Sequence, residues 1–276
     1  MSPPGCPKGE YRSAQHEGTP VSVPPIDRDA LARVLDDAAL PAGYRFELLQ
    51  RDDIGTLAAH VDRWYPDVGI GAASGFLQRG FYEREVLLPG AAQRNFIVVV
   101  VKCGDAIAGM IACEREPEAQ ALYGRLAVVA PGHRGAGLGQ HAIAAVERVG
   151  RALGMGLVYG MATLKIPHTQ QAFERLGWQL IGIVPGYDRE LIAGRARRVY
   201  EAVYAKLLAA GHELLAPDPR QMTPRTRELF ELLFATPQPR ASESAPRQPG
   251  LQWETTRCVS DAQCSTTGTS IPRPCT

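Results

Sequence analysis

The chain has 276 residues, of which 45% are hydrophobic and 21% are charged, values that are ordinary for a globular protein. Its formal net charge of +1 argues against a general binder of nucleic acid or of anionic membranes. No apolar run approaches the roughly 20 residues that span a bilayer, and the N-terminal segment lacks the apolar stretch of a secretory signal. These features predict a cytoplasmic protein.

The N-terminal part is predicted to precede the main domain. Residues 1–25 contain six prolines and little apolar content, so we expect them to be disordered. Residues 26–43 are expected to form an accessory helix, which Asp27 can cap and Pro41 ends.

The next segment reads as a strand followed by two helices. Residues 44–49 alternate in polarity, which is typical of a strand. A helix is predicted from Asp52 or Asp53 through Val61, and a second one over residues 75–88, after a glycine-rich stretch.

The sequence then predicts three strands that form an antiparallel meander. Residues 95–103 are almost continuously apolar, so this strand should be buried on both faces. A Gly-Asp turn leads into a returning strand at 106–114, and residues 121–129 form the third strand. Cys103 and Cys113 would lie far apart along this ladder, which excludes a disulfide between them.

A glycine-rich turn follows the third strand. Pro131 ends the strand, and residues 133–139 read His-Arg-Gly-Ala-Gly-Leu-Gly. Apolar residues then recur at helical spacing from Leu138 to Leu153, and Gly154 suits a left-handed helix end. Backbone N–H groups converge in such a turn and the helix dipole adds to their field, so it predicts an anion site suited to phosphate.

Three kinds of phosphate-binding turn can be compared with this segment. A Walker-type loop ends in Gly-Lys-Ser/Thr, whereas Gly139 is followed by Gln140. A dinucleotide fold needs a third glycine one residue later and an acidic residue at the end of the next strand, and no acid ends residues 157–161. The pattern R/Q-x-x-G-x-G/A fits Arg134 to Gly139 at every position. With the strand residues 126–129 before it, this segment resembles motif A of the GNAT family of acyl-CoA-dependent N-acyltransferases.

The remaining elements continue to residue 208. We predict a strand at 157–161, a short helix at 167–176, a strand at 178–184, a polar loop at 185–197 and a last strand at 199–208.

This order is the GNAT order, and Phe173 to Trp178 resembles the Tyr-x-Lys-x-Gly-Phe segment of that family. The resemblance covers residues 44–208 as an N-acetyltransferase domain. It implies a mixed α/β fold with a central, mostly antiparallel sheet flanked by helices. A V-shaped splay is expected between the strands at 121–129 and 157–161.

The C-terminal part is predicted to lie outside that domain. Within a helical extension at 209–235, Thr223 and Pro224 suit the cap and first position of a helix. Residues 236–276 are rich in Pro, Ser and Thr, so we expect a disordered tail.

The resemblance also implies a co-substrate, acetyl-CoA or another acyl-CoA, and no metal. In the family, the pantetheine arm lies in the splay and the pyrophosphate lies on the turn. The matching residues here are Leu126, Ala127, Val128, His133, Arg134, Gly135, Ala136, Gly137, Leu138, Gly139, His168 and Phe173.

The general acid departs from the family pattern. Many members use a tyrosine at the position of Phe173, and a phenyl ring has no proton to give. Tyr123, Tyr159, Tyr187 or water are the alternatives.

The general base departs from it as well, because the familiar glutamate position falls on Tyr123, which we take as the catalytic candidate. The nearest acids are Glu114 and Glu116. With residue 114 expected to pair with about residue 121, both are predicted to be solvated turn charges remote from the phosphate turn.

The sequence thus predicts an N-acyltransferase that transfers acetyl from acetyl-CoA to a primary amine, of a small molecule or a peptide, by direct attack. The alternative is a catalytically weak acyl-CoA-binding protein with a sensor or structural role, and a third interpretation is a nucleotide-binding fold. Neither nucleic acid nor a membrane is expected as a partner, and a homodimer is left open.

Overall fold

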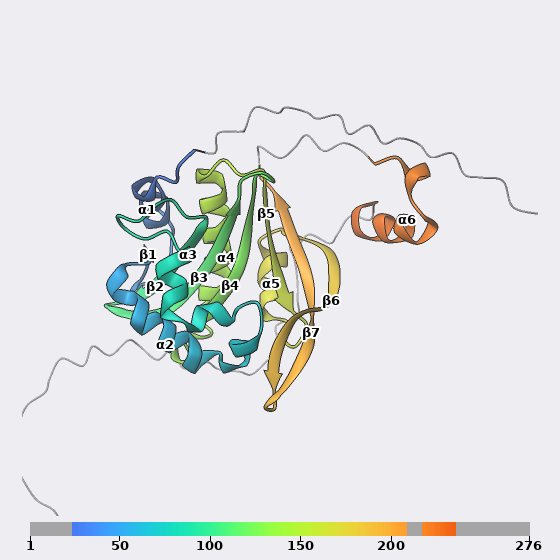
Figure 1. The fold of residues 1–276 in the computed structure, drawn as a ribbon. Helices are drawn as coiled ribbons and strands as arrows, with labels where there is room; N and C mark the ends of the chain where they lie inside the picture. Colours follow the sequence, from blue (N-terminus) through green and yellow to red (C-terminus); the bar gives the residue numbers. More distant parts are fainter. Residues whose placement is uncertain (1–23, 209–216, 236–276) are drawn as a thin grey trace, which may run out of the picture. The chain divides into compact units, whose positions relative to one another are not determined.

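The computed structural model describes residues 24–208 and 217–235 (Figure 1). The predictions for residues 1–23, 209–216 and 236–276 therefore lie outside the described residues. The helices and strands, in chain order, are α1 (Arg28–Asp36), β1 (Tyr44–Leu48), α2 (Ile54–Trp64), α3 (Arg79–Glu85), β2 (Phe96–Cys103), β3 (Ala106–Glu116), β4 (Ala121–Val129), α4 (Leu138–Ala152), β5 (Leu157–Thr163), α5 (His168–Arg175), β6 (Gln179–Ile192), β7 (Arg195–Leu207) and α6 (Pro224–Phe230).

The strands form one seven-stranded sheet in the order β1-β2-β3-β4-β5-β7-β6. All neighbouring strands run antiparallel except β4 and β5, which pair in parallel. The parallel pair needs a crossover, and α4 supplies it. This arrangement confirms the predicted mixed, mostly antiparallel sheet flanked by helices.

Each face of the sheet carries its own hydrophobic core. Helices α1, α4 and α5 pack on one face, and α2 and α3 pack on the other (Figure 1). The 3₁₀ helix η3 (Ser74–Leu77) joins α2 and α3 in the second core. Strand β2 shows the consequence, because Ile97 and Val99 enter the first core while Val98 and Val100 enter the second. Burial on both faces explains the nearly continuous apolar sequence of this strand.

The predicted caps are confirmed at two helices. The Asp27 carboxylate accepts hydrogen bonds from the backbone N–H groups of Asp29 and Ala30 at the start of α1. Thr223 caps α6 by accepting from the N–H of Thr226, with a proline at the first position. The helix predicted over 75–88 is shorter than expected, since only α3 and η3 form there.

The predicted polar loop at 185–197 is wrong. Strand β6 continues to Ile192, and a tight turn at Ala193 and Gly194, both with positive φ, leads directly into β7. The misleading signal was Pro185, which cannot donate to a sheet ladder. The structure accommodates it in an irregular stretch between Pro185 and Asp188 on an edge strand. The result is one long β6–β7 hairpin.

Candidate active site

The sheet opens between β4 and β5. These strands pair only from Ala121 to Gly124 and from Leu157 to Gly160. The pair Gly124 and Gly160 is the last β4–β5 rung. Beyond it, β4 continues to Val129 with β3 on one side, and no described strand pairs with its other edge. Ala127 is exposed although it belongs to a central strand. The predicted splay is therefore present, and it exposes backbone of the segment predicted to hold pantetheine.

A bulge in β4 lies where the splay begins. Cys113 of β3 pairs with Gly124 and Ala112 pairs with Leu126, so Arg125 is an extra residue in β4. A bulge bends its strand and re-aims its side chain, which accounts for the departure of β4 from β5. Sequence reasoning missed this bulge because an apolar strand pattern gives no sign of one extra residue.

The glycine-rich turn has the conformation of an anion site. Gly135 and Gly137 have φ of 86° and 77°, in the left-handed region that other residues avoid. Gly137 is the N-cap of α4, and no side chain caps this helix. The N–H groups of the first helical turn thus have no side-chain partner, and Ala136 is exposed beside them.

Two basic side chains are fixed beside this turn. His133 Nδ1 lies 2.9 Å from the Tyr44 hydroxyl, and the two rings meet edge to face. The Arg134 Nε donates to the carbonyl of Val129 at 3.3 Å, and its guanidinium lies 5.4 Å from the centre of the Tyr65 ring. Both side chains are thus anchored by neighbours at the position predicted for a pyrophosphate.

Two other residues predicted to contact the co-substrate belong to α5. His168 is exposed as the first residue of α5. Phe173 is buried, stacked on Tyr204 with ring centres 5.1 Å apart and tilted against Trp178 at 4.7 Å. Its ring also fills the space beside Gly160, where an added Cβ would lie 3.0 Å from the Phe173 Cζ. The structure therefore gives Phe173 a packing role under the last β4–β5 rung, and its contact with co-substrate stays a prediction.

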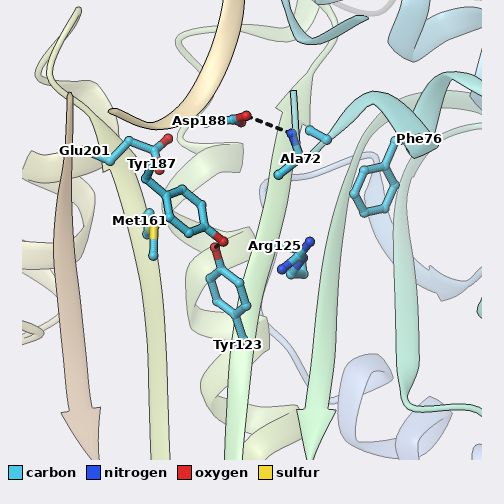
Figure 2. Close-up of a pocket in the computed structure, with 9 residues that line it drawn as sticks. Ala72, Phe76, Tyr123, Arg125, Met161, Tyr187, Asp188 and Glu201 are labelled. Carbon is cyan, nitrogen blue, oxygen red and sulfur yellow. Dashed lines mark hydrogen bonds between the residues drawn. The ribbon is translucent and has the colours of Figure 1, made fainter. Parts of the chain in front are cut away.

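A pocket opens where the sheet splays (Figure 2). Tyr123, Arg125 and Met161, which flank the last β4–β5 rung, contribute to its walls. Other walls come from the β6–β7 hairpin and from the segment between α2 and α3. The lining residues are Ala72, Ala73, Phe76, Tyr123, Arg125, Met161, Tyr187, Asp188 and Glu201.

Tyr123 presents its hydroxyl to this pocket. The hydroxyl lies 3.4 Å from that of Tyr187 (Figure 2). The ring stacks on Tyr159 with centres 4.6 Å apart and planes within 2°. Burial, followed by the contact with Tyr187, raises the pKa of Tyr123 above its ordinary value. Tyr123 is therefore protonated at neutral pH, which suits a hydrogen-bond donor and not a base.

Glu114 and Glu116 belong to strand β3 and are half-buried, so their predicted place in a solvated turn was wrong, although they do lie at the end of β4 far from the glycine-rich turn. Strand β3 runs to Glu116, and this moves the register so that Glu114 pairs with Tyr123. The Glu114 carboxylate lies 3.7 Å from Arg125 Nε, and Glu116 accepts a 2.7 Å hydrogen bond from the Tyr159 hydroxyl. Burial raises the pKa of Glu114, and Arg125 opposes this effect. Glu116 thus binds Tyr159, which stacks on Tyr123, and Glu114 lies beside Arg125.

The segment between α2 and α3 contacts the hairpin at the pocket. The N–H of Ala72 donates to Asp188 Oδ1 at 2.7 Å. Gly71 leaves no room for a side chain, because an added Cβ would overlap the Asp188 carboxylate and the Arg189 carbonyl. A glycine is thus required where this segment meets β6, and the contact closes one side of the pocket.

Glu201 is the functional candidate that the sequence analysis missed. It pairs with Thr163 of β5 and Val184 of β6, and it lines the pocket. Burial raises the pKa of Glu201 to about 7, the charges of Asp188 and Glu190 add to this, and Lys165 opposes it. In the sequence, the only indication of this role is that the charged Glu201 lies on the same face of its strand as the apolar Val199 and Val203.

Neither a metal cluster nor a membrane-spanning helix is found in the described part of the chain. In the ranges 24–208 and 217–235, no three His, Cys, Asp or Glu side chains are grouped to hold a metal ion. No helix within these ranges has the length and apolarity to cross a membrane.

Comparison with known proteins finds a family match within the chain. Residues 58–178 match the model of the acetyltransferase (GNAT) family. The chain contains a GNAT acetyltransferase domain. The matched segment includes the splayed strands, the glycine-rich turn and Phe173, whereas the β6–β7 hairpin with Tyr187, Asp188 and Glu201 lies beyond it.

Solved structures share this fold at low identity, and no curated protein matches the chain. The spermidine/spermine N-acetyltransferase SpeG from Vibrio cholerae, solved in mutant forms, has a TM-score of 0.50 and 14% identity over 62% of this chain and 97% of its own. A further mutant of SpeG from the same organism also has a TM-score of 0.50 and 14% identity, over 63% and 98%. The putative acetyltransferase yncA from Salmonella typhimurium, solved with its cofactor acetyl-CoA, has a TM-score of 0.47 and 15% identity over 64% and 98%.

Proposed function

We propose that this GNAT domain, taken as residues 44–208, is an N-acyltransferase that transfers acetyl from acetyl-CoA to a primary amine by direct attack. The acceptor is a small molecule or a peptide. One observation carries the proposal: the glycine-rich turn and the polar pocket lie along the same splayed strand, β4, with the pocket at the last β4–β5 rung and the turn after the end of the strand.

The turn and the open edge of β4 fit the two parts of an acyl-CoA. The uncapped N–H groups of residues 135–139, with His133 and Arg134 beside them, suit a pyrophosphate. The unpaired backbone edge at Leu126, Ala127 and Val128 suits the amide groups of pantetheine, which hydrogen-bond as a strand does. A bound acetyl-CoA would supply the activated acyl group.

Tyr123 provides the donor for this chemistry. The amine nitrogen forms a bond to the thioester carbonyl carbon, the C–S bond breaks, and negative charge moves to oxygen and then to sulfur. A backbone N–H of splayed β4 would polarise the carbonyl, and the protonated Tyr123 hydroxyl, which lines the pocket, would assist departure of the thiolate. Tyr123 thereby takes the place of the tyrosine that is missing at Phe173.

A second candidate is a catalytically weak acyl-CoA-binding protein. The observation in its favour is the buried ring of Phe173, which packs between Trp178 and Tyr204 and has no hydroxyl to donate a proton. Such a protein would keep the turn and the splay but would not transfer the acyl group.

One experiment separates these functions. The full chain is incubated with acetyl-CoA and a panel of primary amines, and the release of CoA and the acetylated amine are measured by chromatography. Amine-dependent CoA release supports the transferase. CoA binding by calorimetry without turnover on any amine favours the binding protein, and stabilisation by NAD or ATP but not by CoA contradicts both.

A further inference from the structure

The protein uses the two carboxylates of the pocket in different ways. Asp188 Oδ1 accepts hydrogen bonds from the backbone N–H groups of Ala72 and Arg189, both at 2.7 Å. Across the described ranges, by contrast, no side chain donates a hydrogen bond to the Glu201 carboxylate or forms an ion pair with it. Asp188 is therefore engaged in holding the pocket wall, while Glu201 is left for a ligand.

The charges around Glu201 favour a positively charged ligand. Asp188 and Glu190 act on it with negative charge, and Lys165 acts with positive charge. Lys165 itself is in contact with the Glu190 carboxylate and lies 3.9 Å from Asp67 Oδ2. Because Glu190 and Asp67 already neutralise Lys165, the lysine does not balance the charge of Glu201. A cation that enters the pocket would therefore be attracted to the Glu201 carboxylate.

Glu201 lies on the hairpin side of the pocket, beside the splay. Its strand partner Thr163 is two residues beyond Met161, the first β5 residue past the last β4–β5 rung. In Figure 2 the Glu201 side chain lies next to Tyr187, whose hydroxyl points to that of Tyr123. A ligand in this pocket is thus bordered by Glu201 on one side and by the Tyr123 hydroxyl on the other.

We propose that Glu201 receives the acceptor as an ammonium ion and takes one of its protons, so that the acceptor is a cationic primary amine. This inference rests on the proposed acyl transfer. One ammonium proton moves to a Glu201 oxygen, the freed nitrogen lone pair forms the C–N bond while negative charge moves to the carbonyl oxygen, and the C–S bond then breaks. The nitrogen then loses a second proton, which ends on the thiolate sulfur, and Glu201 returns its proton to water.

The ionisation of the two residues agrees with this division of roles. The pKa of Glu201 near 7 leaves part of it ionised at neutral pH, while the raised pKa of Tyr123 keeps the phenol protonated. The charged groups acting on Glu201 are Asp188, Glu190 and Lys165, and Tyr123 acts on it from β4. Arg125 of β4 lines the same pocket, and its guanidinium lies 3.7 Å from the Glu114 carboxylate. The rate should therefore rise with pH as Glu201 loses its proton.

The first test is the pH profile of acetyl transfer by the full chain carrying Glu201→Gln. We expect kcat/KM at pH 7 to fall about 100-fold and the acidic limb to disappear, with CoA affinity unchanged. The matched control is Glu47→Gln, on the distant edge strand β1, which should retain the wild-type profile. A Glu201→Gln variant within about threefold of wild type and with the same acidic limb would overturn the proposal.

The second test needs no turnover, so it separates this proposal from the proposed function. In the presence of CoA, n-butylamine should bind the wild-type chain more tightly than 1-butanol of the same length, and Glu201→Gln should remove the difference. If no amine is acetylated, the proposed transferase fails, and this binding test still decides the role of Glu201. Equal discrimination by the wild type and the variant would contradict it.

A third variant covers the case in which Glu201→Gln does not fold. Glu201→Asp keeps the charge but withdraws the carboxylate by one methylene. It should keep the preference for butylamine and lose kcat, since proton transfer needs contact distance. Unchanged kcat in Glu201→Asp would rule out proton transfer to this residue.

Discussion

The two ends of the proposed site are built in different ways. The co-substrate end comes from one continuous segment, residues 126–139, in which strand, turn and helix start follow one another. The acceptor end is assembled from β4, the segment between α2 and α3, and the β6–β7 hairpin. The first is a backbone site and is recognisable from local sequence, while the second is a side-chain site that exists only once distant strands are neighbours. Only the first lies wholly within the family match.

The largest expected effect tests the backbone end. Gly139→Glu should weaken CoA binding by about 100-fold or more, because a carboxylate would occupy the site of the pyrophosphate. The helix itself should tolerate the change, since an added Cβ at Gly139 meets nothing within 4 Å. Calorimetric titration with CoA measures the effect.

A matched variant tests whether a glutamate in the first turn of any helix would have the same effect. Gly55 is the second residue of α2, as Gly139 is of α4, and a Cβ there also meets nothing within 4 Å. Gly55→Glu should leave CoA affinity unchanged. If Gly139→Glu behaves in the same way, the turn does not hold the pyrophosphate.

The next largest effect concerns the core beneath the last β4–β5 rung. Phe173→Ala removes a buried ring that packs on Trp178 and Tyr204, so the free energy of unfolding should fall by about 3–5 kcal/mol. Urea denaturation gives this value. A loss below about 1 kcal/mol would show that the ring is not packed as described.

A smaller change should disturb only the acceptor end. Gly71→Ala places a methyl group against Asp188 and Arg189, so the segment must move away from the hairpin, at a cost of about 1–3 kcal/mol. The KM for the amine should rise while CoA affinity stays the same. Gly69→Ala is the control in the same segment, because its Cβ would meet Leu77 at an ordinary 3.8 Å. Equal kinetics of the two variants would contradict the proposed role of this contact.

The smallest effect is a pH-dependent gain in stability. The pKa of Glu201 is raised from 4.5 to about 7, so the folded chain binds a proton more tightly than the unfolded chain, and stability falls as pH rises through this range. Glu201→Gln removes that loss. At pH 8 it should be more stable than wild type by about 1 kcal/mol after allowance for solvent screening, and at pH 4 the two should match. Thermal unfolding at both pH values measures this, and a variant that is less stable at pH 8 would mean that the carboxylate supports the fold.

The sequence predicted most of the fold because its signals there are local. Asp27 and Thr223 mark helix starts, Gly154 has the left-handed conformation expected at a helix end, and β2 is almost continuously apolar. Each of these depends on the chemistry of a few neighbouring residues.

The errors share a different origin. The register of Glu114 depends on how far β3 extends, and the loop expected at Pro185 depends on whether an edge strand can absorb a bulge. Glu201 became a candidate only because β7 lies between β5 and β6, which brings it to the pocket beside Asp188. Strand order is a property of the whole chain, and no local pattern of residues predicts it.

The hydrogen bond between Ala72 and Asp188 joins residues 116 positions apart, and it has a consequence for how the domain folds. Contacts of such long sequence separation require closure of a large loop, so they form late. The meander of β2, β3 and β4 and the helix α4 need only short-range closure. We therefore expect a folding intermediate in which the amides of β2 and α4 are already protected from hydrogen exchange while the Ala72 amide still exchanges freely. In such a species the acceptor pocket would be the last part of the site to assemble, and the first to open when the native state fluctuates.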